Sequence, residues 1–340
     1  MSMLTRKKLA FRVITAFTLL AALMALCSLI GTEKIDLENV FSGSENGINP
    51  DYEIFVHVRL PRIILAGIIG AALACSGLIF QSLLRNPLAD PYILGISSGA
   101  GLGAIIAIVA GVNLTIFGHS PVAVFAFIGA LSTVWLVWFI GKLTGRMHVT
   151  GLLLAGVVVN AFFSAMIMFI TSIAKSDKVF STIFWLMGNL SEQSFLVLWL
   201  SGGFVTAGII CLFFISAELN AISFGDIDAR SMGVNTSRVR TIAFAVAAVI
   251  TAIAVSLSGL IGFVGLIIPH AVRLIFGPDH RQLIPLSAIS AAGFLVAADT
   301  VARIIVAPAQ LPVGVVTAII GGPFFLVLLV RYSRKAGLWR

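Results

Sequence analysis

The strongest constraint on this chain is a series of long stretches that carry almost no charge. A membrane-spanning helix needs roughly 20 apolar residues to cross a hydrocarbon core about 30 Å thick. Nine stretches have that size, and they run approximately over residues 13–30, 60–84, 93–112, 121–141, 151–174, 195–216, 241–265, 283–306 and 312–330. A tenth, shorter stretch covers about 266–276. This series predicts an all-α integral membrane protein with about ten transmembrane helices.

The composition excludes several classes of protein. Of the 340 residues, 59% are apolar and 11% are charged, whereas about 25% of the residues in a soluble domain are charged. A soluble enzyme is therefore excluded, and so is a disordered or nucleic-acid-binding chain, despite the net charge of +8. All the cysteines lie inside apolar stretches and the histidines show no paired spacing, so we expect no metal site.

The charges at the two termini decide whether the short stretch crosses the membrane. Each terminus carries four Lys or Arg residues, and cytoplasmic loops collect such residues, so both termini are expected inside. An even number of crossings follows, and ten crossings place 16 basic and 5 acidic residues inside against 6 basic and 9 acidic residues outside. We expect 266–276 to return as a short or broken helix near Gly262, Gly265 and Pro269, packed within protein because irregular backbone is not tolerated against lipid.

The chain lacks the groups that would supply energy or catalysis. It has no Walker A sequence, and the signature-like "LSGGF" at residues 200–204 lies inside an apolar stretch. Almost no ionisable residue falls at mid-depth in the predicted helices, whereas an ion-coupled carrier is expected to bury at least one carboxylate there. An intramembrane enzyme would need converging catalytic side chains, and we predict no catalytic residue. The energy source is therefore expected outside this chain.

Two regions outside the apolar stretches suggest contacts with partners. In the largest cytoplasmic loop, about 217–240, Gly225 and Gly233 bracket a short amphipathic helix whose first turn is acidic, as suits a helix N-terminus. A cytosolic partner could bind this helix, although it could also simply connect two spans. On the outer side, Arg59 and Arg62 precede a helix, where basic charge is unfavourable for the helix dipole. An external acidic partner or lipid phosphates would explain them.

A set of short motifs resembles one transporter family. In order along the chain these motifs are "RLPR", "RNPLADPYILGISSGAG", "LLLAG", "FGDIDARSMGV", "GLIGFVGLIIPHAVRLIFGPDHR", "AADTVAR" and "LPVGVVTAIIGGPFF". Together they resemble the permease subunit of type II ATP-binding-cassette (ABC) importers, the FecCD-type family for iron-siderophore, haem and cobalamin uptake. The resemblance implies the ten-helix permease fold, N-in and C-in, as a single domain over residues 1–340 in a bacterial or archaeal cytoplasmic membrane.

The resemblance also implies partners and sites. We expect a second permease copy (a homodimer, or a pair with a similar chain), two cytosolic ATPase subunits that hold ATP and Mg, and an extracytoplasmic binding protein; this chain itself would bind no cofactor. The resemblance implies three sites in this chain. A docking surface for the binding protein is formed by Arg59, Arg62 and Arg303, and an ATPase coupling segment by Gly225, Asp226, Ala229, Arg230 and Gly233. A cytoplasmic gate is formed by Asn86, Leu88, Val149 and Thr150. The family often has Glu where this chain has Gln310, which puts an outer contact at that position in doubt.

The resemblance and the weakly charged pathway together predict a function. Bare ions need carboxylate, carbonyl or imidazole cages, and the sequence offers none, so a bulky substrate escorted by a protein is expected. We predict ATP-driven import of an iron chelate, siderophore or haem, by alternating access. A cobalamin importer of the same type is the main alternative, and an ion-coupled secondary transporter is a further one.

Overall fold

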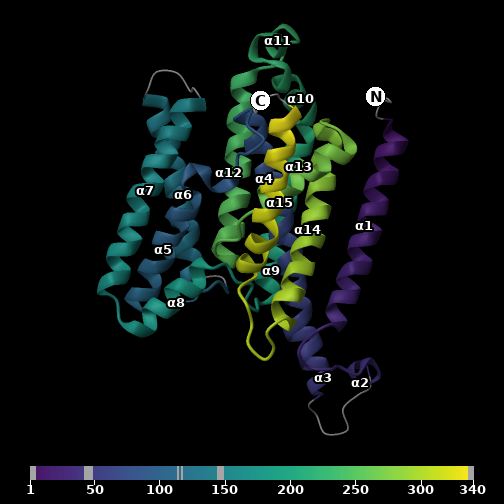
Figure 1. The fold of residues 1–340 in the computed structure, drawn as a ribbon, viewed down its shortest axis with the longest axis vertical. Coiled ribbons are helices and arrows are strands. Elements are labelled where there is room, and N and C mark those ends of the chain that lie inside the picture. Colours follow the sequence, from purple (N-terminus) through teal and green to yellow (C-terminus); the bar gives the residue numbers. More distant parts are fainter. Residues whose placement is uncertain (1–4, 42–48, 113–114, 116–117, 144–148, 336–340) are drawn as a thin grey trace.

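The computed structural model describes residues 5–41, 49–112, 115, 118–143 and 149–335, and these form helices joined by short connections (Figure 1). In the described part of the chain, seven helices are long and apolar enough to span a membrane, and three shorter apolar helices accompany them. The ten membrane helices are α1 Arg6–Leu29, α4 Leu60–Leu83, α5 Ile96–Ala110, α6 Pro121–Leu143, α7 Val149–Ile173, α9 Phe195–Phe214, α12 Thr236–Ser258, α13 Val264–Phe276, α14 His280–Ile304 and α15 Val313–Lys335.

The remaining helices are short and lie at the two ends of the bundle (Figure 1). At the end that carries both termini lie α10 Ser216–Phe224 and α11 Asp226–Ser231. At the opposite end lie α2 Leu37–Phe41, α3 Pro50–Glu53 and α8 Ser176–Leu186. The shared side of the two termini agrees with the even number of crossings predicted from charge, so we call that side cytoplasmic.

Helix α4 forms the centre of the bundle and packs against α9, α12, α13 and α14. It is continuous with α3 through a π-helical segment, Ile54–Arg59. Small residues allow its backbone to approach its neighbours, as is usual between membrane helices. A Cβ atom on Gly77 would lie 1.9 Å from the carbonyl oxygen of Gly265 in α13, so no other residue fits there without moving the helices apart.

The predicted short helix exists, but the break that precedes it lies earlier than expected. Helix α12 ends at Ser258 rather than near residue 265, and α13 begins at Val264, so Gly265 and Pro269 lie within a helix. The intervening backbone turns at Gly259 (φ 65°) and Phe263 (φ 69°). Left-handed φ values end a helix without any proline, and the sequence pattern alone does not reveal them.

Side chains and loops from elsewhere satisfy the polar backbone groups of this break. The Tyr92 hydroxyl donates to the Ile261 carbonyl (2.9 Å) and accepts from the Ile261 N–H (3.2 Å). Because Pro269 has no N–H, the Gly265 carbonyl has no helical partner, and the Gln81 amide donates to it at 3.3 Å. The expectation that irregular backbone here is packed within protein is confirmed.

Candidate functional site

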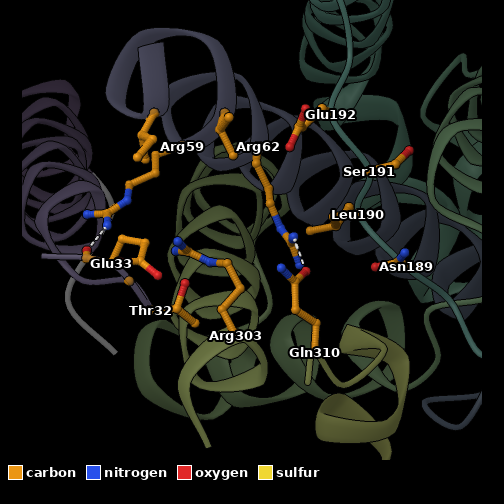
Figure 2. Close-up of a pocket in the computed structure, with 13 residues that line it drawn as sticks. Thr32, Glu33, Arg59, Arg62, Asn189, Leu190, Ser191, Glu192, Arg303 and Gln310 are labelled. Atoms are coloured by element: carbon orange, nitrogen blue, oxygen red, sulfur yellow. Dashed lines mark hydrogen bonds between the residues drawn. The ribbon is translucent and has the colours of Figure 1, made fainter. Parts of the chain in front are cut away.

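A cavity of about 610 Å³ lies at the extracytoplasmic end of the bundle (Figure 2). Its walls come from the chain after α1, the start of α4, residues 189–192 and the end of α14. The three arginines predicted to dock a binding protein, Arg59, Arg62 and Arg303, all line it. Their residues are 4%, 7% and 6% exposed, so the chain brings them together but buries most of their surface.

One carboxylate holds two of these arginines. Asp299, which is fully buried, accepts from Arg62 Nε on Oδ1 (3.0 Å) and from Arg303 Nε on Oδ2 (3.1 Å). The pair Asp299–Arg303 is four residues apart on α14, whereas Arg62 comes from α4. Such charge-assisted bonds satisfy a buried carboxylate that would otherwise be strongly destabilising.

Arg59 and Arg62 also donate hydrogen bonds to neutral oxygen atoms of the backbone and of a side-chain amide. Arg59 donates to the carbonyl oxygens of Ser28, Leu29 and Glu33, and these bonds fasten the end of α1 to the start of α4. Arg62 Nη1 donates to the Gln310 side-chain oxygen at 2.8 Å (Figure 2). The neutral Gln310 therefore serves as a partner for Arg62, and no contact outside the chain is needed to explain its position.

The buried layer of the cavity carries an excess of positive charge. Three arginines line the cavity, and the buried Asp299 bonds to two of them. The two carboxylates that line the cavity, Glu33 and Glu192, are exposed. A partner's carboxylate would therefore have to enter the cavity to meet the guanidinium groups. Docking by these arginines stays a prediction. Glu33 and Glu192 were missed because nothing in their local sequence links them to arginines far along the chain.

The predicted coupling segment forms the cytoplasmic tip of the molecule (Figure 1). Gly225 separates α10 from α11 with φ 141° and ψ 158°, a backbone conformation that is essentially restricted to glycine. The short helix with an acidic first turn, bracketed by Gly225 and Gly233, is confirmed. Ala229 is fully buried, whereas the tip exposes three large apolar side chains that the sequence analysis missed: Phe224 (77%), Ile227 (85%) and Met232 (57%).

Ion pairs connect this tip to the membrane helices. Asp226 Oδ1 lies 2.5 Å from Arg85, which follows α4, and 2.6 Å from Arg240 in α12. Arg230 Nε donates to the Thr236 hydroxyl at 3.3 Å, next to the start of α12. A displacement of α11 would therefore act directly on the cytoplasmic ends of two central helices.

The predicted gate residues lie on two separate elements. Asn86 and Leu88 belong to the connection between α4 and α5, where the Asn86 side chain accepts from the Leu88 N–H (2.9 Å) and Leu88 is 43% exposed. Val149 and Thr150 begin α7, but their side chains lie outside the described part of the chain. Their role in a gate stays a prediction.

An ionisable group that the sequence analysis did not single out lies in the same connection. Asp90 accepts from the Tyr92 N–H at 2.8 Å and caps a short 3-10 turn, Pro91–Leu94. Burial raises the pKa of the Asp90 carboxyl to about 6. In the part of the chain that the structure describes, no group of three or more His, Cys, Asp or Glu side chains could hold a metal ion.

Comparisons with known proteins agree with this arrangement. The chain is 41% identical to an uncharacterised ABC transporter permease of Bacillus subtilis over 298 residues, covering 86% of this chain and 84% of that protein. It is 36% identical to the hemin transport system permease of Yersinia pestis (90% and 91% covered) and 43% identical to the cobalamin import system permease of Halobacterium salinarum (80% and 72% covered).

A solved structure shares the fold over most of the chain. An inward-facing structure assigned to the metal-chelate type of ABC transporter aligns with a TM-score of 0.80 and 29% identity, over 93% of this chain and 98% of that one. A model of the FecCD transport family matches residues 18–331. The chain is a multi-pass membrane permease and belongs to the FecCD transport family.

Proposed function

We propose that this chain is the permease subunit of an ATP-driven importer that moves a bulky iron chelate, siderophore or haem, across a bacterial or archaeal cytoplasmic membrane. The observation that carries the proposal is the exposed apolar tip of α10 and α11, which is bonded through Asp226 to α4 and α12. An exposed patch of this kind on a folded surface marks a protein interaction site. The relatives named for hemin, cobalamin and metal chelates support the class of substrate.

In this proposal the mechanism is alternating access driven from the cytoplasm. Two ATPase subunits, which hold ATP and Mg, bind the tips around Phe224 and Ile227 of two permease copies. Their closure displaces α11, and the Asp226 ion pairs pass that displacement to α4 and α12. The two gates then open in turn, because the ATPases bind the two conformations with different affinity. This chain binds no cofactor and performs no bond chemistry itself.

The other partners follow from the remaining exposed surfaces. Helix α7 exposes large apolar side chains along much of its length, including Leu154, Phe162, Met168 and Ile173. Part of that surface would face lipid, and part would pack against a second permease copy, the same chain or a similar one. On the outer side, a binding protein would insert acidic side chains into the arginine-lined cavity, where bidentate guanidinium–carboxylate pairing gives an oriented contact.

Cobalamin is the alternative substrate, because one of the relatives is named as a cobalamin import permease. The test is the ATPase activity of this chain copurified with its candidate ATPase in lipid, with binding protein loaded with ferric siderophore, haem or cobalamin. We expect stimulation by one loaded protein, which identifies the substrate.

Two variants make this test specific. Ile227→Glu places a charge on the apolar tip and should abolish copurification of the ATPase. Tyr52→Glu changes an exposed residue on the outer face (43% exposed) and should leave copurification intact. Failure of the ATPase to bind the intact wild-type permease would contradict the proposal and favour an ion-coupled secondary transporter.

A further inference from the structure

Two further cavities adjoin at the outer ends of α6, α9 and α12. The first, which we call the outer groove, has a volume of about 420 Å³ and is lined almost entirely by apolar side chains, among them Phe127, Leu200 and Phe204. The second, the outer polar cavity, also measures about 420 Å³ and lies beside α8. Ala123, Ser256 and Leu257 line both, so the two cavities share a wall.

The outer groove lies at membrane depth and opens sideways. Helix α6 begins at Pro121 and α9 at Phe195, so at about 1.5 Å per residue Phe127 and Phe204 lie roughly 9 Å and 14 Å in from those outer ends. Both helices are apolar enough to span a membrane. Leu200 is 39% exposed and Phe204 is 65% exposed, so the groove faces the surrounding bilayer. An occupant that enters from the bilayer must be an apolar chain.

The outer polar cavity offers the opposite chemistry. Its described lining residues include several hydroxyl and amide side chains and one cation, Lys178, and they include no carboxylate. Lys178 is half-buried on α8 and forms no ion pair with a described residue. At the groove, burial lowers the pKa of the His119 imidazole, which favours its neutral form. The two cavities together present one positive charge beside an apolar slot.

We propose that the outer groove and the outer polar cavity together bind one anionic phospholipid of the outer leaflet. One acyl chain lies in the groove beside Leu200 and Phe204, and the phosphate lies in the polar cavity beside Lys178 and its neighbouring hydroxyl groups. A molecule with one negative charge and a long apolar chain is complementary to both halves. A soluble anion would fill only the polar cavity, and a hydrocarbon would fill only the groove. Asn189 and Ser191 line both the outer polar cavity and the arginine-lined cavity, so the site adjoins the cavity assigned to the binding protein. It lies at the opposite end of the bundle from the tip assigned to the ATPase.

The test measures lipid binding to the delipidated full-length chain in detergent by native mass spectrometry. The probes are dioleoyl phosphatidylglycerol, dioleoyl phosphatidylcholine and soluble glycerol 3-phosphate. One lysine near an anionic lipid headgroup contributes about 1 kcal/mol, or about fivefold in affinity, whereas the choline of phosphatidylcholine cancels the charge of its phosphate. We therefore expect the wild-type chain to bind phosphatidylglycerol about fivefold more tightly than phosphatidylcholine, and glycerol 3-phosphate not to displace either lipid.

Variants separate the two halves of the site. Lys178→Glu should remove the preference for phosphatidylglycerol. Leu200→Trp should weaken the binding of both lipids, because the larger side chain fills the groove. The matched controls are Lys175→Glu, an exposed cation on the N-terminal side of α8, and Ile210→Trp, an exposed position on α9 outside the groove. Both controls should bind as the wild type does.

Four results would overturn the proposal. Equal binding of the two lipids by the wild type, or a preference that survives Lys178→Glu, would show that Lys178 does not select an anionic headgroup in the polar cavity. Unchanged binding by Leu200→Trp would place the acyl chain elsewhere. Displacement of phosphatidylglycerol by glycerol 3-phosphate would show a site for a small anion and no requirement for a lipid chain.

Discussion

At the scale of single residues, Asp299 organises the outer end of the bundle. Its carboxylate is fully buried and bonds to guanidinium groups from two helices, whose residues are 7% and 6% exposed. Removing one member of a buried ion network leaves the others uncompensated, which typically costs 3–5 kcal/mol. The network therefore fixes the positions of α4 and α14 as well as the shape of the outer cavity.

We expect Asp299→Leu to lower the free energy of unfolding by about 3–5 kcal/mol, because Arg62 and Arg303 then remain buried without a carboxylate. Thermal unfolding of the purified chain in detergent measures the loss. Asp177→Leu, an acidic residue on the exposed face of α8, is the matched control and should unfold close to the wild type. Equal melting temperatures for the two variants would contradict the assigned network.

A second residue-scale prediction concerns Asp90, whose pKa is raised by burial from 3.8 to about 6. Because the folded state binds this proton more tightly than the unfolded state, its contribution to stability is fully present below about pH 3.8. It is lost as the pH rises through about 6. Asn keeps the bond to the Tyr92 N–H without a charge, so Asp90→Asn should be more stable than the wild type at pH 7.5, by up to about 3 kcal/mol.

The measurement is the difference in melting temperature between Asp90→Asn and the wild type at pH 5 and at pH 7.5. Groups common to both proteins cancel in this difference. The difference should be larger at pH 7.5 than at pH 5. A difference that is the same at both pH values would show that Asp90 ionises normally.

At the scale of elements, the break between α12 and α13 depends on residues far from it in sequence. Tyr92 and Gln81 supply hydrogen bonds that the interrupted helix cannot supply for itself. The chain can therefore place irregular backbone inside the bundle without leaving its polar groups unpaired. Through Tyr92, the break also links the α4–α5 connection to α12 and α13.

Tyr92→Phe should destabilise this break, because the Ile261 N–H and carbonyl lose their shared partner at about 1–3 kcal/mol per buried unsatisfied group. Hydrogen exchange of the amides in residues 259–263 measures the effect locally, and we expect faster exchange there. Tyr52→Phe, an exposed tyrosine in α3, should leave that segment unchanged. Protection equal to the wild type in Tyr92→Phe would contradict the assigned role.

The elements also show which parts of the structure are readable from the sequence. The positions of the membrane helices follow from apolar length, and α11 follows from its flanking glycines and acidic first turn. The end of α12 does not, because it depends on the backbone conformation at Gly259 and Phe263. The bonds of Arg62 to Asp299 and Gln310 join residues more than 230 positions apart, and periodicity carries no information about such contacts.

At the scale of the whole molecule, the distribution of basic residues predicts which end of the bundle is cytoplasmic. The tertiary contacts show through which residues a displacement at that end would reach the membrane helices. Both termini and the α10–α11 tip lie at one end, and the arginine-lined cavity lies at the other (Figure 1, Figure 2). The tip is bonded to Arg85, which follows α4, and α4 runs through the centre of the bundle to the outer cavity. This arrangement suits a permease that is driven from the cytoplasm and loaded from outside.

The most direct test of this account is uptake of the identified chelate into proteoliposomes that contain the permease, its ATPase and the loaded binding protein. We predict that uptake requires ATP inside the vesicles, survives ionophores that abolish proton and sodium gradients, and is lost in Ile227→Glu. Uptake that proceeds without ATP and stops when the ion gradients are removed would contradict the central claim.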